Sequence, residues 1–223
     1  MFKKIFDHEN GFWRGMSKAA DAISLNLLFM LCCIPVITIG ASASAFYYNM
    51  MKLVKDEETY IIRGFFKAFK ENFKKATIIW IIMFVLGAFL LFDCYLLTKN
   101  TAFFPSFLRY IIYAITFVYA LMLSFVFALQ ARFENSVINT IKNSLFMGIG
   151  HFLPWGVIIV LVTYLPITLL FIRLDIILYI FPLLFVGVFA FTFYINSKCF
   201  LRIFKRYTPK EPEEDYLEET YYE

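Results

Sequence analysis

Long apolar runs alternate with short charged stretches along this chain, and the runs set the expected architecture. Crossing the hydrocarbon of a bilayer takes about 20 helical residues. We predict spans at residues 22–51, 76–97, 110–131, 152–172 and 176–197. Because lipid offers backbone groups no hydrogen-bond partner, continuous runs of this kind predict helices rather than a barrel. The expected fold is an all-α integral membrane protein, a bundle of about five transmembrane helices in one domain over residues 1–207.

The first run, residues 22–51, is longer than one span needs and is interrupted in its middle. Pro35 removes a backbone donor and disfavours helix at Ile34, and Gly40 follows closely. Two arrangements are consistent with this pattern. The run is either one kinked span, which we favour, or a re-entrant hairpin whose two short limbs meet at the break.

Two stretches between the spans have helical periodicity and predict cytoplasmic amphipathic helices at the membrane interface, over residues 60–75 and 132–147. In the first stretch, apolar residues gather within about 100° of the helix surface, and these are Ile62, Phe65, Phe66, Phe69 and Phe73. The opposite face holds Arg63, Lys67, Lys70 and Lys74. Such a helix is expected to lie on an anionic inner leaflet, with its aromatic face at the acyl boundary.

Lys and Arg near the ends of spans mark the cytoplasmic side of a membrane protein. They concentrate in residues 52–75, 132–151 and 198–206, so we predict that these segments and the C-terminus are cytoplasmic. Five crossings then place the N-terminus outside, whereas a re-entrant first run would place it inside. Residues 208–223 are polar and acidic and predict a disordered tail.

Composition supports a bilayer rather than water as the solvent. Apolar residues make up 61% of the chain, against about 45–50% in soluble domains, and the mean hydropathy is +0.70. These values exclude an ordinary soluble enzyme. A formal net charge of +4 is too small to indicate a nucleic-acid partner.

Few side chains in the predicted spans could carry chemistry. Polar residues and the helix break define one candidate binding locus, Asn26, Pro35, Thr38, Gly40 and Ser42. The acidic residue of the second span, Asp93, is a second candidate, because an intramembrane carboxylate indicates a cation or proton site. Its place near the far end of the span also suits an interfacial, hydrogen-bonded Asp.

Neither the histidines nor the four cysteines have metal-ligand spacing, and no motif for a nucleophile or a phosphate loop is present. We therefore expect no metal, no cofactor and no enzymatic activity.

Several short motifs carry a resemblance to a known family. They are Leu25-Asn26-Leu27-Leu28, the segment from Pro35 to Ala41 (PVITIGA), Tyr47-Tyr48, Phe65-Phe66, Phe69-Lys70 and Asn72-Phe73. With these motifs the chain resembles the YesL-like family of bacterial membrane proteins, domain of unknown function 624. The resemblance implies a plasma membrane protein of a Gram-positive bacterium without defined catalytic residues. Members are commonly encoded beside carbohydrate importers and polysaccharide-degrading enzymes, which implies a role in sugar uptake.

Two functions are compatible with these features. The first is an accessory subunit that binds the subunits of a carbohydrate ABC importer, or a membrane sensor. The alternative is a small transporter or channel that uses the broken first run as its substrate site. The ladder of Phe65, Phe69 and Phe73 aligns with that of Val137, Ile141 and Leu145, which is compatible with a parallel repeat of the kind found in transporters and also with the common biophysics of interfacial helices alone. A homo-oligomer is compatible with either function.

Overall fold

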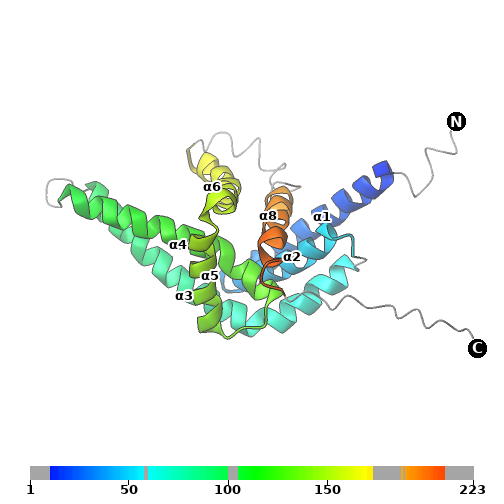
Figure 1. Cartoon of the computed structure of the whole chain (residues 1–223). Coiled ribbons are helices and arrows are strands. Elements are labelled where there is room, and N and C mark those ends of the chain that lie inside the picture. Colours follow the sequence, from blue (N-terminus) through cyan, green and yellow to red (C-terminus); the bar gives the residue numbers. More distant parts are fainter. Residues whose placement is uncertain (1–10, 58–59, 100–104, 173–186, 188, 209–223) are drawn as a thin grey trace, which may run out of the picture.

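The computed structural model describes residues 11–57, 60–99, 105–172, 187 and 189–208, and the regular elements of these residues are all helical (Figure 1). The elements are α1 (Gly11–Cys33), η2 (Val36–Thr38), α2 (Ile39–Val54), α3 (Ile61–Lys99), α4 (Ser106–Arg132), α5 (Val137–Gly150), η3 (Phe152–Gly156), α6 (Val157–Ile172) and α8 (Phe189–Phe204). The predicted all-α class is therefore confirmed. Among the described helices, three are long and apolar enough to cross a membrane, and they are Gly15–Cys33, Ile61–Lys99 and Ser106–Arg132.

The first apolar run folds as a helical hairpin, so the single kinked span that we favoured is wrong. α1 and α2 pack along each other, and the ring centroids of Phe29 and Phe46 are 5.2 Å apart. Pro35 adopts an extended backbone, with φ −75° and ψ 116°, between the two helices. Because this extended residue is followed by a short 3₁₀ segment, the chain reverses at the break instead of bending there.

The open end of this hairpin brings the start of α1 beside the segment that follows α2. The Lys18 Nζ atom lies 2.5 Å from a carboxylate oxygen of Asp56. We predicted that the N-terminus and residues 52–75 lie on opposite sides of the membrane. The two limbs of the hairpin begin and end at the same place, as in the re-entrant alternative, and the side of the membrane on which the N-terminus lies stays a prediction.

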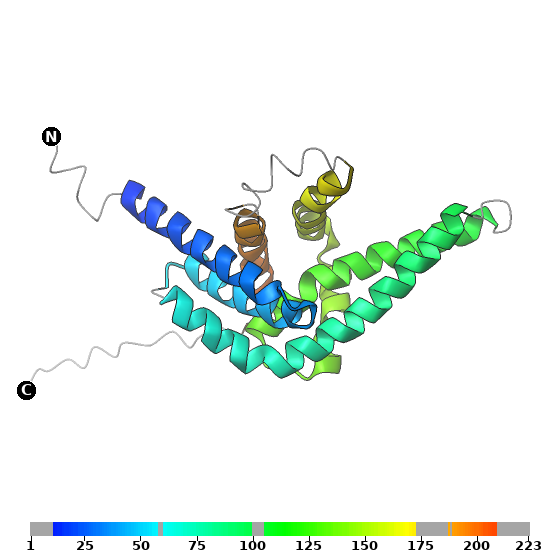
Figure 2. The same ribbon diagram turned by 180° about the vertical axis from the view of Figure 1, so that it is seen from behind.

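α3 is a single helix that contains both the predicted interfacial helix of residues 60–75 and the predicted span of residues 76–97. It holds no proline, so nothing in its covalent structure ends the helix where the polarity changes. Both views show that α3 curves, with its first half beside α2 and its second half beside α4 (Figures 1 and 2). The two predicted elements are therefore one helix with two environments.

α3 and α4 form a long antiparallel hairpin that projects away from the other helices (Figure 2). The hydroxyl of Tyr119 donates to the carbonyl of Met83 at 2.7 Å. A Cβ atom at Gly87 would lie only 2.3 Å from that hydroxyl oxygen, so glycine is required for this close approach. The other end of α4, residues 121–130, is almost entirely buried in the body of the protein.

The second predicted interfacial helix, residues 132–147, corresponds to α5 and the turn that precedes it. The Ser136 hydroxyl caps α5 by accepting from the backbone N–H of Asn139 at 3.3 Å. The predicted apolar ladder is partly buried against the core formed by α4 and α8, and it comprises Phe133, Val137, Ile141 and Leu145. The ladder therefore contacts protein rather than facing outward alone.

The fourth predicted span, residues 152–172, begins with a break. Leu153 is non-helical, with φ −112° and ψ 131°, because it precedes Pro154. α6 starts three residues after this proline, at Val157. The connection at 173–175, most of the fifth predicted span and the predicted tail beyond Thr208 lie outside the described residues, and α8 holds the end of that span.

The core surrounds α2, in which almost every residue from Gly40 to Met51 is buried. α2 contacts α1, α3, α4 and α8. On one side Phe46 packs with Leu25 and Phe65, and on the other side α4 and α8 contribute a second cluster around Phe200. The most buried helix is therefore the second limb of the first apolar run.

Candidate functional site

The break between α1 and α2 is held by side-chain hydrogen bonds. The hydroxyl of Thr38 bonds to the carbonyl of Cys32, at the end of α1, and to that of Pro35 at 2.7 Å. From α3, the indole N–H of Trp80 donates to the carbonyl of Val36 at 2.8 Å. These contacts tie the turn to the end of α1 and to α3.

Gly40 is the point of closest approach between α2 and α3. A Cβ atom at this position would lie 2.4 Å from the backbone oxygen of Ala76 and 2.6 Å from the Cβ of Trp80. Close backbone contact through small residues is a common way for membrane helices to associate. Gly40 therefore serves helix packing in this structure.

The five residues of the predicted binding locus do not line a common cavity among those described below. Thr38 and Gly40 belong to the packed turn, and Pro35 is exposed beside them. Asn26 and Ser42 are fully buried, in α1 and α2 respectively. Asn26 lies about 12 Å along α1 from the turn, at 1.5 Å per residue. The structure thus separates Asn26 from the turn, whereas the buried Ser42 lies within one helical turn of Gly40.

The four basic residues predicted on the first amphipathic helix are all exposed on α3, and they are Arg63, Lys67, Lys70 and Lys74. The predicted aromatic face opposite them is divided. Phe65 is completely buried in the cluster with α1 and α2, whereas Ile62, Phe66 and Phe73 are exposed. Packing against α2 therefore uses only part of that face.

Other cations at the same end of the molecule rest on aromatic rings. Lys52 lies 4.8 Å from the ring centroid of Tyr48, and Lys198 lies 4.4 Å from that of Tyr194. The Arg202 guanidinium is 5.2 Å from the ring of Trp155. Such cation–π contacts are typical where charged and aromatic residues meet at a boundary of polarity.

Asp93 lies on the projecting part of α3 and is half-buried. The neighbouring thiol of Cys94 is 3.6 Å from the hydroxyl of Thr116 on α4. This region is separate from the break, so the structure does not combine the two candidate sites. Within the part of the chain that the structure describes, no three or more His, Cys, Asp or Glu residues gather as metal ligands would.

A buried chain of hydrogen bonds joins α3, α4 and α5, and sequence reasoning missed it. The amide of Gln130 donates to the side-chain oxygen of Asn72 at 3.0 Å. The hydroxyl of Thr140 donates to the other end of the Gln130 amide at 3.3 Å. The sequence signal for this hydrogen-bonded chain was Gln130, an uncharged amide at the end of an apolar run. Its partners on other helices could not be identified from the sequence.

A second buried amide joins α6 and α8. The side-chain N–H of Asn196 donates to the hydroxyl of Thr163 at 2.8 Å. Asn196 is almost completely buried. Polar side chains in membrane helices often bond across helices in this way.

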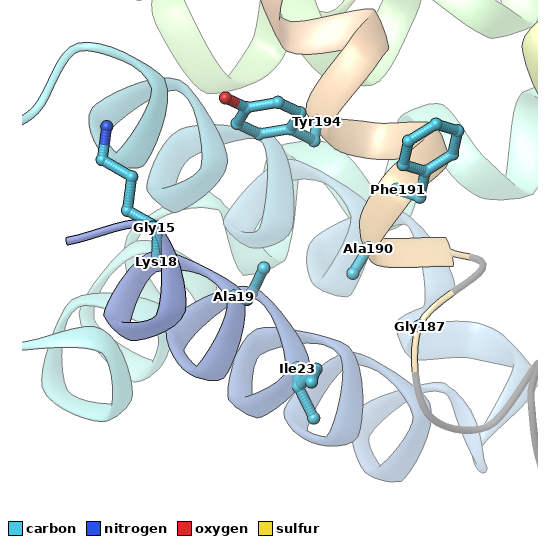
Figure 3. A pocket seen from close by; sticks show the side chains of 9 residues that line it. Gly15, Lys18, Ala19, Ile23, Gly187, Ala190, Phe191 and Tyr194 are labelled. Atoms are coloured by element: carbon cyan, nitrogen blue, oxygen red, sulfur yellow. The ribbon is translucent and has the colours of Figure 1, made fainter. Parts of the chain in front are cut away.

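An apolar pocket of about 340 Å³ lies between α1 and α8 (Figure 3). Small side chains form much of its wall, including Ala19 and Ala190. Figure 3 shows Lys18 and the hydroxyl of Tyr194 at one end of this pocket and Phe191 at the other. A more open depression of about 680 Å³ lies between α1 and the start of α3, lined by residues that include Asp21 and Arg63.

A comparison with known protein families gives a match for the first part of this chain. The family model described as "Protein of unknown function, DUF624" matches residues 22–94. This range covers most of α1, the turn, α2 and α3 as far as Cys94, and so includes the contacts of Gly40 and Trp80. Comparisons with curated proteins and with solved structures gave no match. The match over residues 22–94 confirms the resemblance of this part of the chain to the YesL-like proteins, the family of domain of unknown function 624.

Proposed function

We propose that this protein is a non-enzymatic accessory subunit of the plasma membrane that supports carbohydrate uptake by an ABC-type importer, or its sensing. The observation that carries the proposal is the α3–α4 hairpin, which projects from the other helices (Figure 2). Large apolar side chains are exposed over much of its length.

The uncovered residues come from both helices of the hairpin. On α3 they include Ile78, Ile81, Ile82, Phe84, Val85, Leu86, Phe89, Leu91 and Phe92. On α4 they include Phe107, Tyr110, Ile111, Tyr113, Ile115 and Phe117. A contiguous apolar patch of this extent marks a surface for membrane or protein contact. Its position at one side of the molecule suits insertion between lipid and the helices of a partner.

The nature of the partner follows from the family resemblance. YesL-like proteins are expected beside carbohydrate importers, so the membrane subunits of such an importer, or a membrane sensor for its substrate, are the partners that we propose. A second copy of this chain is the competing occupant of the same surface.

Photo-crosslinking in native membranes tests this proposal. A photo-reactive residue is placed at Phe89, which is 62% exposed on the hairpin, and in a matched variant at Ile138, which is 65% exposed on α5. We expect crosslinks from position 89, but not from position 138, to an importer subunit or a sensor. Crosslinks from position 89 only to lipid, or only to a second copy, would contradict the accessory role.

We further propose that the first half of α3 rests on the headgroups of the anionic cytoplasmic leaflet, with the C-terminal end of α8 on the same side. Each basic residue near such a surface contributes about 1 kcal/mol. In nanodiscs, we expect anionic lipid to raise the thermal stability of the native protein. This gain should disappear when Arg63, Lys67, Lys70 and Lys74 are all replaced by Glu. Lys99→Glu, at the opposite end of α3, is the control and should retain it.

A further inference from the structure

We propose that the α1–α2 hairpin does not cross the membrane but lies within the leaflet on the basic side, with its apolar turn covered by acyl chains. The N-terminal end of α1 is then on the same side as residues 52–75. The inference rests on the proposed position of the first half of α3 at the headgroups, and it is independent of the identity of any protein partner.

The first step is the register of α2 against α3. A Cβ atom at Gly64 would lie 2.5 Å from the side-chain oxygen of Asn49, so these two positions are in direct contact. At the other end of α2, Gly40 touches Ala76 and Trp80. α2 therefore runs antiparallel to the first half of α3 and not along its second half, as both views show (Figures 1 and 2).

The second step is depth. The part of α3 beside α2 carries exposed cations up to Lys75, and charged side chains are costly in hydrocarbon. Asn49 lies level with this charged part, so most of α2 lies level with the headgroups. Trp80, which holds the turn, is only about 7.5 Å along the helix from Lys75 at 1.5 Å per residue. The hydrocarbon core is about 30 Å thick, so the turn stays in one leaflet.

The third step is the surface of the turn. Its exposed side chains are apolar, with Ile34 74%, Val36 57% and Ile37 55% exposed. The run between Asp21 and Lys52 contains no charged residue. Apolar exposure without charge suits acyl chains and not water.

The backbone of the turn is also adapted to this environment. A polar backbone group left without a partner in hydrocarbon costs several kcal/mol. Thr38 bonds to the carbonyls of Cys32 and Pro35, and Trp80 donates to that of Val36. These contacts allow an irregular turn to lie among acyl chains.

Cysteine accessibility in intact cells tests the inference, in a variant whose four native cysteines are replaced by Ala. Gly15→Cys reports the start of α1, where a Cβ atom meets no other atom within 4 Å. Glu134→Cys, in the exposed turn before α5, and Ser106→Cys, at the exposed start of α4, are the two reference positions.

We expect an impermeant maleimide to label S106C in intact cells, and to label G15C and E134C only after the membrane is permeabilised. Complete labelling of all three variants in detergent verifies that each protein is present. Labelling of G15C together with S106C in intact cells would place the start of α1 on the side opposite residues 52–75, and would overturn the inference.

A spin label at Ile37→Cys tests the occupant of the turn. In reconstituted bilayers we expect more frequent collisions with oxygen than with a water-soluble nickel complex, and a shallower depth than at Leu86→Cys. Protection from both reagents would mean that protein covers the turn, and a depth equal to that at Leu86 would mean that the turn reaches the midplane. Either result overturns the proposal, whatever the crosslinking of the α3–α4 hairpin reveals.

Discussion

The junction inside α3 and the junction between α5 and α6 have similar sequence patterns but different backbone structures. In each, a helix with an apolar ladder leads directly into an apolar run. α3 passes from Lys75 to Ala76 without interruption, whereas the chain after α5 breaks at Leu153, before Pro154. A change of polarity therefore does not end α3, whereas the break after α5 falls immediately before a proline.

The two junctions also differ in what surrounds them. Ala76 is fully buried and contacts Gly40 of α2, so the continuous helix is clamped where its environment changes. At the other junction, Gly150 has open space around it. The comparison indicates that the close packing of Gly40 on Ala76 maintains the continuous junction, while Pro154 accounts for the break at the other one.

Exchanging the proline between the two junctions should have the largest effect. We expect Ala76→Pro to destabilise the protein by more than about 3 kcal/mol, because proline inside a helix removes a hydrogen bond and clashes with the preceding turn. Pro154→Ala is the counterpart and should cost much less, since it only relaxes Leu153. Unfolding in mixed micelles measures both, and equal losses would contradict the comparison.

The clamp at the continuous junction can be tested by adding one methyl group. Gly40→Ala places a Cβ against the backbone oxygen of Ala76, which cannot rotate away, so we expect a loss of about 2 to 3 kcal/mol. Gly150→Ala is the control at the broken junction and should be neutral or stabilising by up to about 1 kcal/mol. If both variants unfold alike, Gly40 is not the clamp.

The amide chain of α3, α4 and α5 links the two regions, and breaking it should have an intermediate effect. Gln130→Leu leaves Asn72 and Thr140 without their shared partner, so we expect a loss of about 1 to 2 kcal/mol. Adding Asn72→Leu should cost less than the sum of the two single changes. Asn143→Leu, an exposed position on α5, should change stability by less than about 0.5 kcal/mol.

The smallest effect is expected at the turn. Thr38→Val removes the hydroxyl that bonds to Cys32 and Pro35, and should cost about 1 kcal/mol. Thr98→Val is a matched control, because the hydroxyl of Thr98 bonds within its own exposed helical turn, to the carbonyl of Tyr95. Oligosaccharide flux in proteoliposomes, present in the native protein and lost in Thr38→Val without loss of stability, would instead support a transporter with its site at the break.

Local patterns anticipated much of the secondary structure. The uncharged runs predicted helices, and Pro35 marked the end of α1 within two residues. The amphipathic patterns located the exposed basic residues of α3 and the partly buried ladder of α5. The patterns did not predict that one helix continues across Ala76. Periodicity shows which faces of a helix are apolar, but it does not show whether two neighbouring segments form a single helix.

The candidate site was less predictable. Thr38 and Gly40 were identified as a polar and small-residue locus, but their roles depend on Trp80 and Ala76, which come from another helix. Gln130 and Asn72 became partners only through the packing of α3 on α4. Contacts between side chains of different helices cannot be identified from the pattern of a single sequence.

The amino-acid sequence by itself determined that the chain is helical and adapted to a bilayer, since long apolar runs leave the backbone no other partner than its own helix. The sequence also determined which segments lack charged residues and can therefore lie in hydrocarbon. Only the tertiary structure decided that the first run is a hairpin and that α2 lies along the charged half of α3. The reason is that a proline permits either a kink or a reversal, and the contacts of Gly40, Asn49 and Trp80 with the neighbouring helix select the reversal.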